Sequence, residues 1–279
     1  MNITLKKANL LIVDPQKCFT TKSGALFVPN ADVDVVNIAN MITNHIDTIG
    51  SIAVTGDFHP TVMISFPNYW VNAKGEHPAP FTVISVEDIE KGTWKTTDPD
   101  NQAWALYYTK KLEENNKTKN NNFFDLRIWP YHGIVGTDGA MFDQVILNAI
   151  APYMEDKVTI VMKGMNPHTE QQGALEADVP VPGDSETAKN TQLANWLDKA
   201  IANGGDILIG GEAEDICLAY SVYSILNYLP QQFHNRIVLL SDCMSPIYPE
   251  LGQVFINDMK IKYGIRISNS IDYFNGCIK

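Results

Sequence analysis

Long hydrophobic stretches and closely spaced cysteines are both missing from this sequence of 279 residues. A helix that crosses a bilayer needs about 20 consecutive apolar residues, and no stretch approaches that length. The four cysteines include no Cys-x-x-Cys pair and no dense spacing, so a disulfide framework is not expected. We therefore predict a reducing compartment, the cytoplasm.

Basic residues are scarce as well. Lys and Arg number 21 against 32 Asp and Glu, which gives a formal net charge of -11. A negative chain repels phosphate backbones and anionic lipid headgroups. No glycine-rich phosphate loop is present either. We expect neither nucleic acid nor a membrane surface as a partner, and a small molecule as the ligand.

Short apolar runs alternate with stretches of helical periodicity along most of the chain. The runs, which we predict to be strands, are residues 9–13, 51–55, 158–162, 207–209 and 237–240. The predicted helices are residues 31–45, 141–153, 187–202 and 215–226. Continuous apolar runs are typical of strands buried on both faces of a parallel sheet. The pattern predicts an α/β fold, a three-layer α/β/α sandwich with a mainly parallel central sheet.

One segment between Phe66 and Trp129 breaks this alternation. It is too long for a plain connection within a compact domain. We predict a single domain over residues 1–279 that carries an insertion at about 68–125. The insertion is expected to be helical around 104–112, with an Asn- and Lys-rich tip, and to act as a lid or a subunit contact.

Polar residues follow several of the predicted strands, at the sheet edge where ligands of open parallel sheets bind. They are Asp14, Asp57, His59, Lys163, the turn 210–217 and Asp242. An aspartate, a lysine and a cysteine at one edge have a specific chemical use. The lysine ammonium favours the thiolate of the cysteine, and the carboxylate can move a proton between nucleophile, leaving group and water.

Cys217 has the best position among the four cysteines for a nucleophile. It follows a glycine-containing turn and falls in the first turn of a predicted helix, where the helix dipole lowers the pKa of a thiol. The amides of that turn could stabilise an oxyanion. On its own, Cys217 could equally be a buried structural thiol, as we expect for Cys18, Cys243 and Cys277. Taken singly, Asp14 and Lys163 could be strand-end residues without a chemical role.

Five motifs in sequence order carry a resemblance to a known family. They are LIVDPQKCF at 11–19, TGDFHP at 55–60, WPYHG with GTDGA at 129–140, KG at 163–164 and GEAEDIC at 211–217. The set is similar to the motifs of the isochorismatase-like cysteine hydrolases, and in particular of their nicotinamidase branch. The motifs cover most of the chain outside the insertion, and their order is more specific than any one of them.

The resemblance implies a three-layer α/β/α domain with a catalytic triad of Asp14, Lys163 and Cys217. It also implies a non-proline cis peptide between Glu212 and Ala213. That peptide would direct the backbone amides of Ala213 and Cys217 at the oxyanion.

The nicotinamidase branch further implies a divalent metal, usually zinc, held by Asp57, His59 and His132. One carboxylate and two imidazoles form an ordinary mixed site for zinc or iron. The metal would bind the pyridine nitrogen of the substrate, while Phe19 and Trp129 sandwich its ring. Related enzymes form dimers or tetramers, so a homo-oligomer is expected. Without the resemblance, the three ligands could be loop or core residues with local hydrogen bonds.

The function that these motifs predict is hydrolysis of a small carboxamide through a cysteine thioester, with nicotinamide as the first substrate. Two alternatives stay open: a metal-free hydrolase of an N-carbamoyl or ureido compound, and a non-catalytic binding member of the family. The chain departs from the nicotinamidase pattern at Gly133, where a cysteine is usual, and at Glu212 and Glu214. If either glutamate points toward Cys217, it would raise the pKa of the thiol or favour a cationic substrate.

Overall fold

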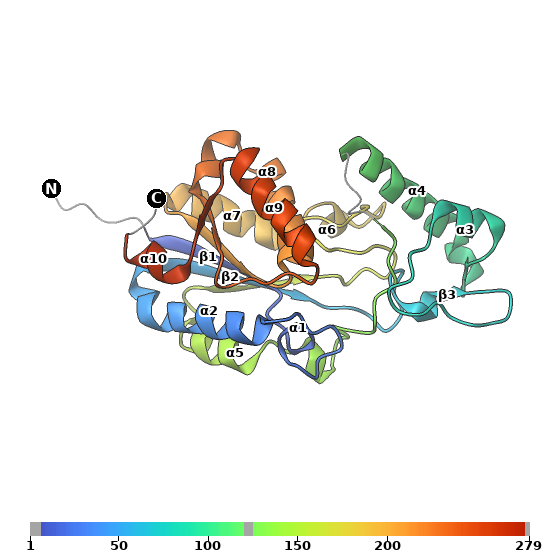
Figure 1. The fold of residues 1–279 in the computed structure, drawn as a ribbon, viewed down its shortest axis with the longest axis horizontal. Coiled ribbons are helices and arrows are strands. Elements are labelled where there is room, and N and C mark those ends of the chain that lie inside the picture. Colours follow the sequence, from blue (N-terminus) through green and yellow to red (C-terminus); the bar gives the residue numbers. More distant parts are fainter. Residues whose placement is uncertain (1–6, 120–124, 277–279) are drawn as a thin grey trace.

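The computed structural model describes residues 7–119 and 125–276, so Cys277 and the asparagines at 120–122 lie outside the described residues. A parallel sheet lies between two layers of helices (Figure 1). Its strands are β1 (Ala8–Val13), β2 (Ile49–Asp57), β5 (Val158–Lys163), β6 (Ile207–Gly211), β7 (Ile237–Leu240) and β8 (Arg266–Ser268). The spatial order is β5-β2-β1-β6-β7-β8, and every neighbouring pair is parallel. The predicted α/β/α sandwich is therefore confirmed.

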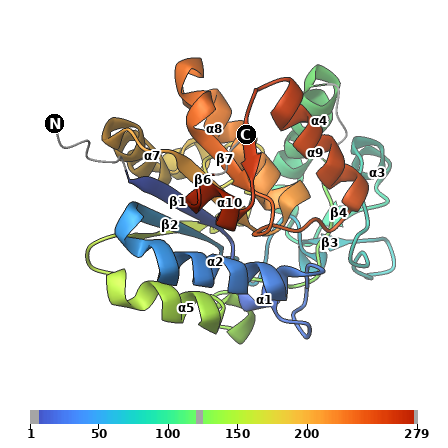
Figure 2. The same cartoon turned by 60° about the vertical axis from the view of Figure 1, so that its left-hand side comes forward.

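The helices cover both faces of the sheet, as the two views in Figures 1 and 2 show. One layer contains α1 (Lys17–Thr20), α2 (Ala31–His45) and α5 (Gln144–Ile150); the other contains α7 (Thr191–Asn203), α8 (Ala219–Tyr228) and α9 (Pro249–Ile261). Two shorter helices are α6 (Ser185–Ala188) and α10 (Ser270–Phe274). Alternate residues of β1 pack on opposite layers: Leu10 and Ile12 on the first, Leu11 and Val13 on the second. Burial on both faces is the reason that this strand is a continuous apolar run.

Successive strands are added first on one side of β1 and then on its other side, so β1 is the switch point of the sheet. The chain passes from β1 to β2 on one side and reaches β6 on the other side only later. Ligands of such sheets bind beyond the carboxyl ends of the strands at this point. In the register, Val13 pairs with Gly211 and Asp57 pairs with Lys163. Asp14, Asp57, Lys163 and the turn after Gly211 consequently share one edge of the sheet.

The helix boundaries differ from the sequence predictions where a capping residue intervenes. Helix α2 has the predicted bounds, whereas α5 begins after Asp143 and α7 begins after Asn190. In both cases the side chain of the capping residue accepts a hydrogen bond from the first turn. The region predicted as one helix from 215 begins as a π-helical turn, Glu214–Leu218, and continues as α8. Strand β8 is half-buried and short, so it lacks the apolar run that marks the other strands.

The segment 67–119 forms a lobe at one end of the molecule (Figure 1). It contains a short antiparallel pair of strands, β3 (Trp70–Val71) and β4 (Lys95–Thr96). Helix α3 (Val86–Lys91) lies between the two strands in the chain, and α4 (Gln102–Lys119) follows them. Trp70 and Tyr108 are fully buried within its apolar cluster, which also includes Val179 and Tyr220 from the rest of the chain. The lobe is thus packed against the sandwich by hydrophobic contacts.

Three aromatic residues of this lobe hold the loop that follows β5. The indole N–H of Trp104 donates to the carbonyl of His168 at 2.6 Å, and the backbone N–H of Glu170 donates to the Tyr108 hydroxyl at 3.2 Å. The Tyr69 hydroxyl lies 3.2 Å from Nδ1 of His168. The lobe therefore supports the loop whose Gln171 carbonyl accepts a hydrogen bond from Lys163.

Within the described residues, none of the helices has both the length and the hydrophobicity needed to cross a membrane.

We expect the packing of the lobe to depend on Tyr108 and not on its neighbour Tyr107. Tyr108 is fully buried, whereas Tyr107 is 47% exposed on the same helix. Tyr108→Ala should cost about 3–5 kcal/mol of stability, and Tyr107→Ala under about 1 kcal/mol. Urea unfolding measures the cost, and hydrogen exchange of α3, α4 and residues 164–172 locates it. Equal losses of unfolding free energy in the two variants would contradict this packing.

Candidate active site

Lys163 is the centre of a buried polar cluster at the carboxyl edge of the sheet. Its side chain is inaccessible to solvent. The ammonium Nζ lies 3.1 Å from Asp14 Oδ2, 3.0 Å from Asp57 Oδ1 and 3.7 Å from Cys217 Sγ. It also donates a hydrogen bond of 2.8 Å to the carbonyl of Gln171. The three residues predicted as a triad are thus brought together around one positive charge.

The charges of this cluster follow from burial and pairing. Burial alone would lower the pKa of Lys163, but Asp14 and Asp57 raise it well above its ordinary value, so the ammonium stays charged. Burial would raise the pKa of Asp57, yet His59 and Lys163 hold it well below its usual range. For Asp14, burial prevails over Lys163 and the pKa is raised. Asp14 is therefore the carboxyl group of this pair that can hold a proton.

A sharp backbone turn after β1 positions Asp14. Its φ of 44° is in the left-handed region, which few residues other than glycine adopt. The backbone N–H of Asp14 donates to Thr55 Oγ1 at 3.0 Å, and the Thr55 hydroxyl donates to Asp14 Oδ1 at 2.5 Å. Oδ1 is thereby engaged, and Oδ2 faces Lys163.

Cys217 lies in the π-helical turn that follows β6 and is 8% exposed. The peptide between Glu212 and Ala213 is cis, as the resemblance implies. Burial raises the pKa of the Cys217 thiol well above its ordinary value, although the Lys163 ammonium acts to lower it. The lowered pKa expected from the helix terminus is therefore not found, because desolvation of the thiolate outweighs the favourable charges.

Asp57, His59 and His132 form a second cluster beside the first. Asp57 Oδ2 lies 3.0 Å from Nε2 of His59 and 3.5 Å from Nε2 of His132. The Nδ1 of each ring lies against a backbone carbonyl, that of Gly164 for His59 at 3.2 Å and that of Pro130 for His132 at 2.7 Å. Because a carbonyl only accepts, each Nδ1 donates to it, and Nε2 is the nitrogen of each ring that faces Asp57.

This second cluster has the features of a metal site. Its three ligand atoms all lie within 4.8 Å of one another. Among the described residues, His59 Nε2 is buried without a hydrogen-bond partner. A carboxylate and two imidazoles whose other nitrogens are held by carbonyls suit zinc or another divalent transition metal. Asp57, His59 and His132 thus fit the metal that the sequence predicted.

Two glycines give this cluster its close packing. Gly133 has φ +58°, and a Cβ there would lie 2.4 Å from the carbonyl oxygen of Asp57. Gly164 has φ +79°, and a Cβ there would lie 2.7 Å from Asp57 Oδ1 and 2.8 Å from His59 Cε1. A side chain at position 133 would therefore require the backbone at Asp57 to move.

Gln16 is a site residue whose function the sequence did not reveal. Its amide Nε2 donates to the carbonyls of Asp57 and Ala140, each at 2.9 Å, and its Oε1 accepts the N–H of Asp57 at 2.6 Å. Gln16 therefore ties the ends of β1 and β2 together. It follows Asp14 and Pro15 in the first motif, but only the contacts distinguish it from a loop glutamine.

A narrow pocket adjoins Cys217. Its lining includes the predicted ring-binding residues Phe19 and Trp129 together with Asp57, His132, Glu170, Gln172, Ala213, Ile216 and Ile247. The free space is about 20 Å³, which holds about one water molecule, so a ring-sized ligand requires side chains to move apart. All of the predicted site residues lie in this pocket or in the two clusters beside it.

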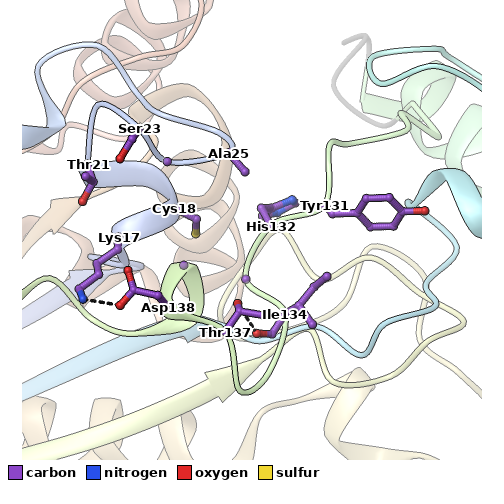
Figure 3. A pocket seen from close by; sticks show the side chains of 13 residues that line it. Lys17, Cys18, Thr21, Ser23, Ala25, Tyr131, His132, Ile134, Thr137 and Asp138 are labelled. Atoms are coloured by element: carbon purple, nitrogen blue, oxygen red, sulfur yellow. Dashed lines mark hydrogen bonds and ion pairs between the residues drawn. The ribbon is translucent and has the colours of Figure 1, made fainter.

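His132 also lines a larger cavity of about 340 Å³. Figure 3 shows this cavity with the ion pair of Lys17 and Asp138 on one side and His132 and Tyr131 on the other. Cys18 lines it as well, and burial raises the pKa of that thiol. The imidazole of His132 thus lies between the narrow Cys217 pocket and this larger cavity.

The loop after β5 contributes residues that sequence analysis missed. Glu170 is 5% exposed and lines the Cys217 pocket, and its Oε2 has no hydrogen-bond partner among the described residues. Gln172 donates to Asp178 at 3.0 Å, and burial raises the pKa of Asp178 to about 8. The run Thr169–Gln172 is wholly polar yet buried, and the sequence contains no sign of that burial.

Three acidic residues that sequence analysis considered as neighbours of the site do not line the Cys217 pocket. Neither Glu212 nor Glu214 lines the Cys217 pocket, so they do not act on the thiol as direct neighbours there. Glu212 faces Asp34 of α2 instead. Asp242 accepts hydrogen bonds from the backbone and hydroxyl of Ser270, which is a structural contact.

Comparison with known proteins gives matches in structure but not in sequence. No protein-family model and no curated protein matches the chain. The structure of the yeast nicotinamidase bound to the inhibitor nicotinaldehyde matches with a TM-score of 0.65 and 19% identity, over 94% of this chain and 99% of that one. An Acinetobacter baumanii nicotinamidase/pyrazinamidase matches with a TM-score of 0.63 and 19% identity, over 97% and 99%. The pyrazinamidase of Pyrococcus horikoshii in complex with zinc matches with a TM-score of 0.55 and 21% identity, over 94% and 99%. At these identities the matches show that the chain has the fold of these structures.

We expect Gly164→Ala to disturb the Asp57 cluster much more than Gly183→Ala. Both glycines have positive φ, so both variants carry similar backbone strain. A Cβ at Gly183 meets nothing within 4 Å, whereas one at Gly164 meets Asp57 and His59. Zinc binding measured by competition with a chromogenic chelator should therefore weaken only in Gly164→Ala. Equal zinc affinity in the two variants would argue against this packing.

Proposed function

We propose that this chain is a cysteine amidohydrolase that cleaves a small carboxamide, with nicotinamide converted to nicotinate and ammonia as the reaction to test first. One observation carries the proposal: the Lys163 ammonium lies within 3.7 Å of both Cys217 Sγ and an Asp14 oxygen, at the carboxyl edge of the sheet. The solved structures with the same fold include nicotinamidases and pyrazinamidases, which supports this choice of substrate.

The first half of the reaction forms a thioester on Cys217. Asp14 takes the thiol proton, and the adjacent Lys163 stabilises the thiolate. The sulfur then adds to the amide carbon, and the backbone amides of Ala213 and Cys217 stabilise the resulting oxyanion. Asp14 returns the proton to the amide nitrogen as the carbon–nitrogen bond breaks, and ammonia leaves. Because burial raises the pKa of Asp14, its protonated form is a stable intermediate state.

The second half releases the acid. Asp14 takes a proton from a water molecule, whose oxygen adds to the thioester carbon. The carbon–sulfur bond then breaks, and Asp14 returns the proton to the sulfur of Cys217. Each proton that Asp14 accepts is thus given back within the same half-reaction. Lys163 keeps its charge throughout, since Asp14 and Asp57 raise its pKa well above its ordinary value.

Asp57, His59 and His132 are the residues that would hold a divalent metal, for which we propose zinc. When bound there, the metal supplies a Lewis acid for the pyridine nitrogen of the substrate. Phe19 and Trp129 would then lie on the faces of the ring, because both line the pocket that contains Cys217. Glu170 and Gln172, from the loop after β5, line the same pocket and complete our set of substrate contacts.

The insertion at 68–125 acts, in this proposal, as a support for the substrate pocket. Trp104 and Tyr108 hold the backbone of His168 and Glu170. The position of the Glu170 side chain in the pocket consequently depends on the lobe. We infer that the insertion influences which amides fit.

We expect Cys217→Ala to abolish ammonia release from nicotinamide, and Cys243→Ala to retain it. Both cysteines are buried, but only Cys217 contacts Lys163. A coupled assay for ammonia measures the rate, and iodoacetamide labelling followed by mass spectrometry compares the two thiols in the wild type.

If the folded, zinc-loaded wild type releases no ammonia from nicotinamide or pyrazinamide, those substrates are wrong; N-carbamoyl compounds are then assayed with the same variants. Release that persists in Cys217→Ala would overturn the mechanism.

We expect His132→Ala to weaken zinc binding by about 100-fold or more, and His77→Ala to leave it unchanged. His77 is a matched control because its Nδ1 also lies against a backbone carbonyl, that of Trp70, while its ring is outside the Asp57 cluster. Isothermal titration with zinc measures both affinities. Unchanged affinity in His132→Ala would remove this residue from the proposed ligands.

A further inference from the structure

Asp34 and Glu212 form a buried acidic pair that the proposed reaction does not use. Asp34 lies in the first turn of α2 and is 5% exposed, and Glu212 follows β6 and is 1% exposed. The two carboxyl groups lie within hydrogen-bonding reach of each other. They connect the helix layer that contains α2 with the turn that leads to Ala213 and Cys217.

The surroundings of this pair offer little to stabilise two negative charges. Both carboxyl oxygens of Glu212 and Oδ2 of Asp34 are buried, and apart from the two carboxyl groups themselves Ser245 is the polar group that stabilises their charge. A different arrangement holds Asp215, three residues further on, whose carboxylate accepts the backbone N–H groups of Ile247 and Tyr248 at 2.8 Å each. Two buried carboxylates in contact cannot both be ionised at modest cost, whereas a carboxylic acid can donate to a carboxylate.

The charged groups that act on the pair are themselves acidic. The charge of Glu214, in the π-helical turn, acts on Glu212, while Asp242, after β7, and Asp32, on α2, act on Asp34. Ser245 is the neighbouring polar group that favours the ionised forms. Burial first, and the charge of Asp34 second, raise the pKa of Glu212 well above its ordinary value, and burial raises the pKa of Asp34 as well. Every acidic neighbour thus favours retention of a proton.

We propose that Asp34 and Glu212 share one proton, and that the resulting hydrogen bond is a positioning device that fastens the turn 212–217 to α2. Glu212 directly precedes Ala213 in the turn that follows β6, so its anchorage determines where the backbone amides of Ala213 and Cys217 lie. The positioning role rests on the proposed function, in which these amides stabilise the oxyanion. The shared proton itself does not depend on any substrate.

A shared proton makes stability depend on pH in a defined direction. In the unfolded chain, Glu212 loses its proton near its ordinary pKa of 4.5, while in the folded chain it keeps the proton to higher pH. Folding therefore loses stability as the pH rises above 4.5 toward the folded pKa. A glutamine at this position donates the same hydrogen bond and does not titrate, so it removes this loss.

We expect Glu212→Gln to raise Tm relative to the wild type, with a gain that grows between pH 5 and pH 8 to at least about 2–4 °C. Asp34→Asn should act in the same way, because it also leaves one amide donor and one carboxylate. The double variant should be no more stable than the better single variant, since only one proton is involved. Glu87→Gln, on α3 and paired with Lys91 at the surface, is the matched control and should show no such pH dependence.

Two outcomes of thermal melting would overturn the shared proton: a lower Tm for Glu212→Gln at both pH values, or additive gains in the double variant. The positioning role is tested by Glu212→Leu, which keeps the volume but cannot donate. Its amides at 213–218 should exchange hydrogen faster than in Glu212→Gln, and its kcat should be lower by about tenfold or more. Equal exchange and equal kcat in the two variants would remove that role. Because melting and exchange need no substrate, they decide this inference even if the wild type hydrolyses no amide.

Discussion

The buried ammonium of Lys163 is the constraint around which the polar edge of the sheet is built. Removing such a charge from water costs several kcal/mol unless opposite charges and hydrogen bonds replace the solvent. Asp14, Asp57 and the carbonyl of Gln171 supply these partners. They come from the ends of β1 and β2 and from the loop after β5, so the charge of Lys163 requires these three segments to meet.

Further groups of the site are held in place through Asp57 and Gln171, the partners of Lys163. Asp57 faces the ammonium through Oδ1 and the two imidazoles through Oδ2, so the ion pair and the proposed metal site share one carboxylate. Gln171 belongs to a loop that Trp104 and Tyr108 hold from the insertion. A segment that interrupts the α/β pattern thereby contributes to the geometry of the site, even though α4 itself does not line the pocket.

Sequence analysis located the elements and the site residues where short-range signals are strong. The apolar runs of β1, β6 and β7 are buried on both faces, and the helix at 31–45 has the predicted bounds. The half-buried β8 has no comparable run and was missed. Glu170 and Gln172 were missed for a related reason: their residue types are typical of exposed loops, and only the tertiary packing buries them.

The order and chemistry of the residues by themselves determined the α/β architecture, the grouping of Asp14, Lys163 and Cys217, and the set Asp57, His59 and His132. Strand periodicity is sufficient for the architecture, and the rule that parallel strands end at one edge brings Asp14, Asp57 and Lys163 together. The choice of Cys217 as nucleophile and the metal set with His132 came from the resemblance of the five motifs. Tertiary structure alone decided the ionisation of these groups and the direction of the acidic side chains. Cys217 has a raised rather than a lowered pKa because burial removes the water that would stabilise its thiolate. Glu212 turns toward Asp34 instead of the pocket, and that contact joins two residues that are far apart in the chain and meet only because α2 packs across the end of β6.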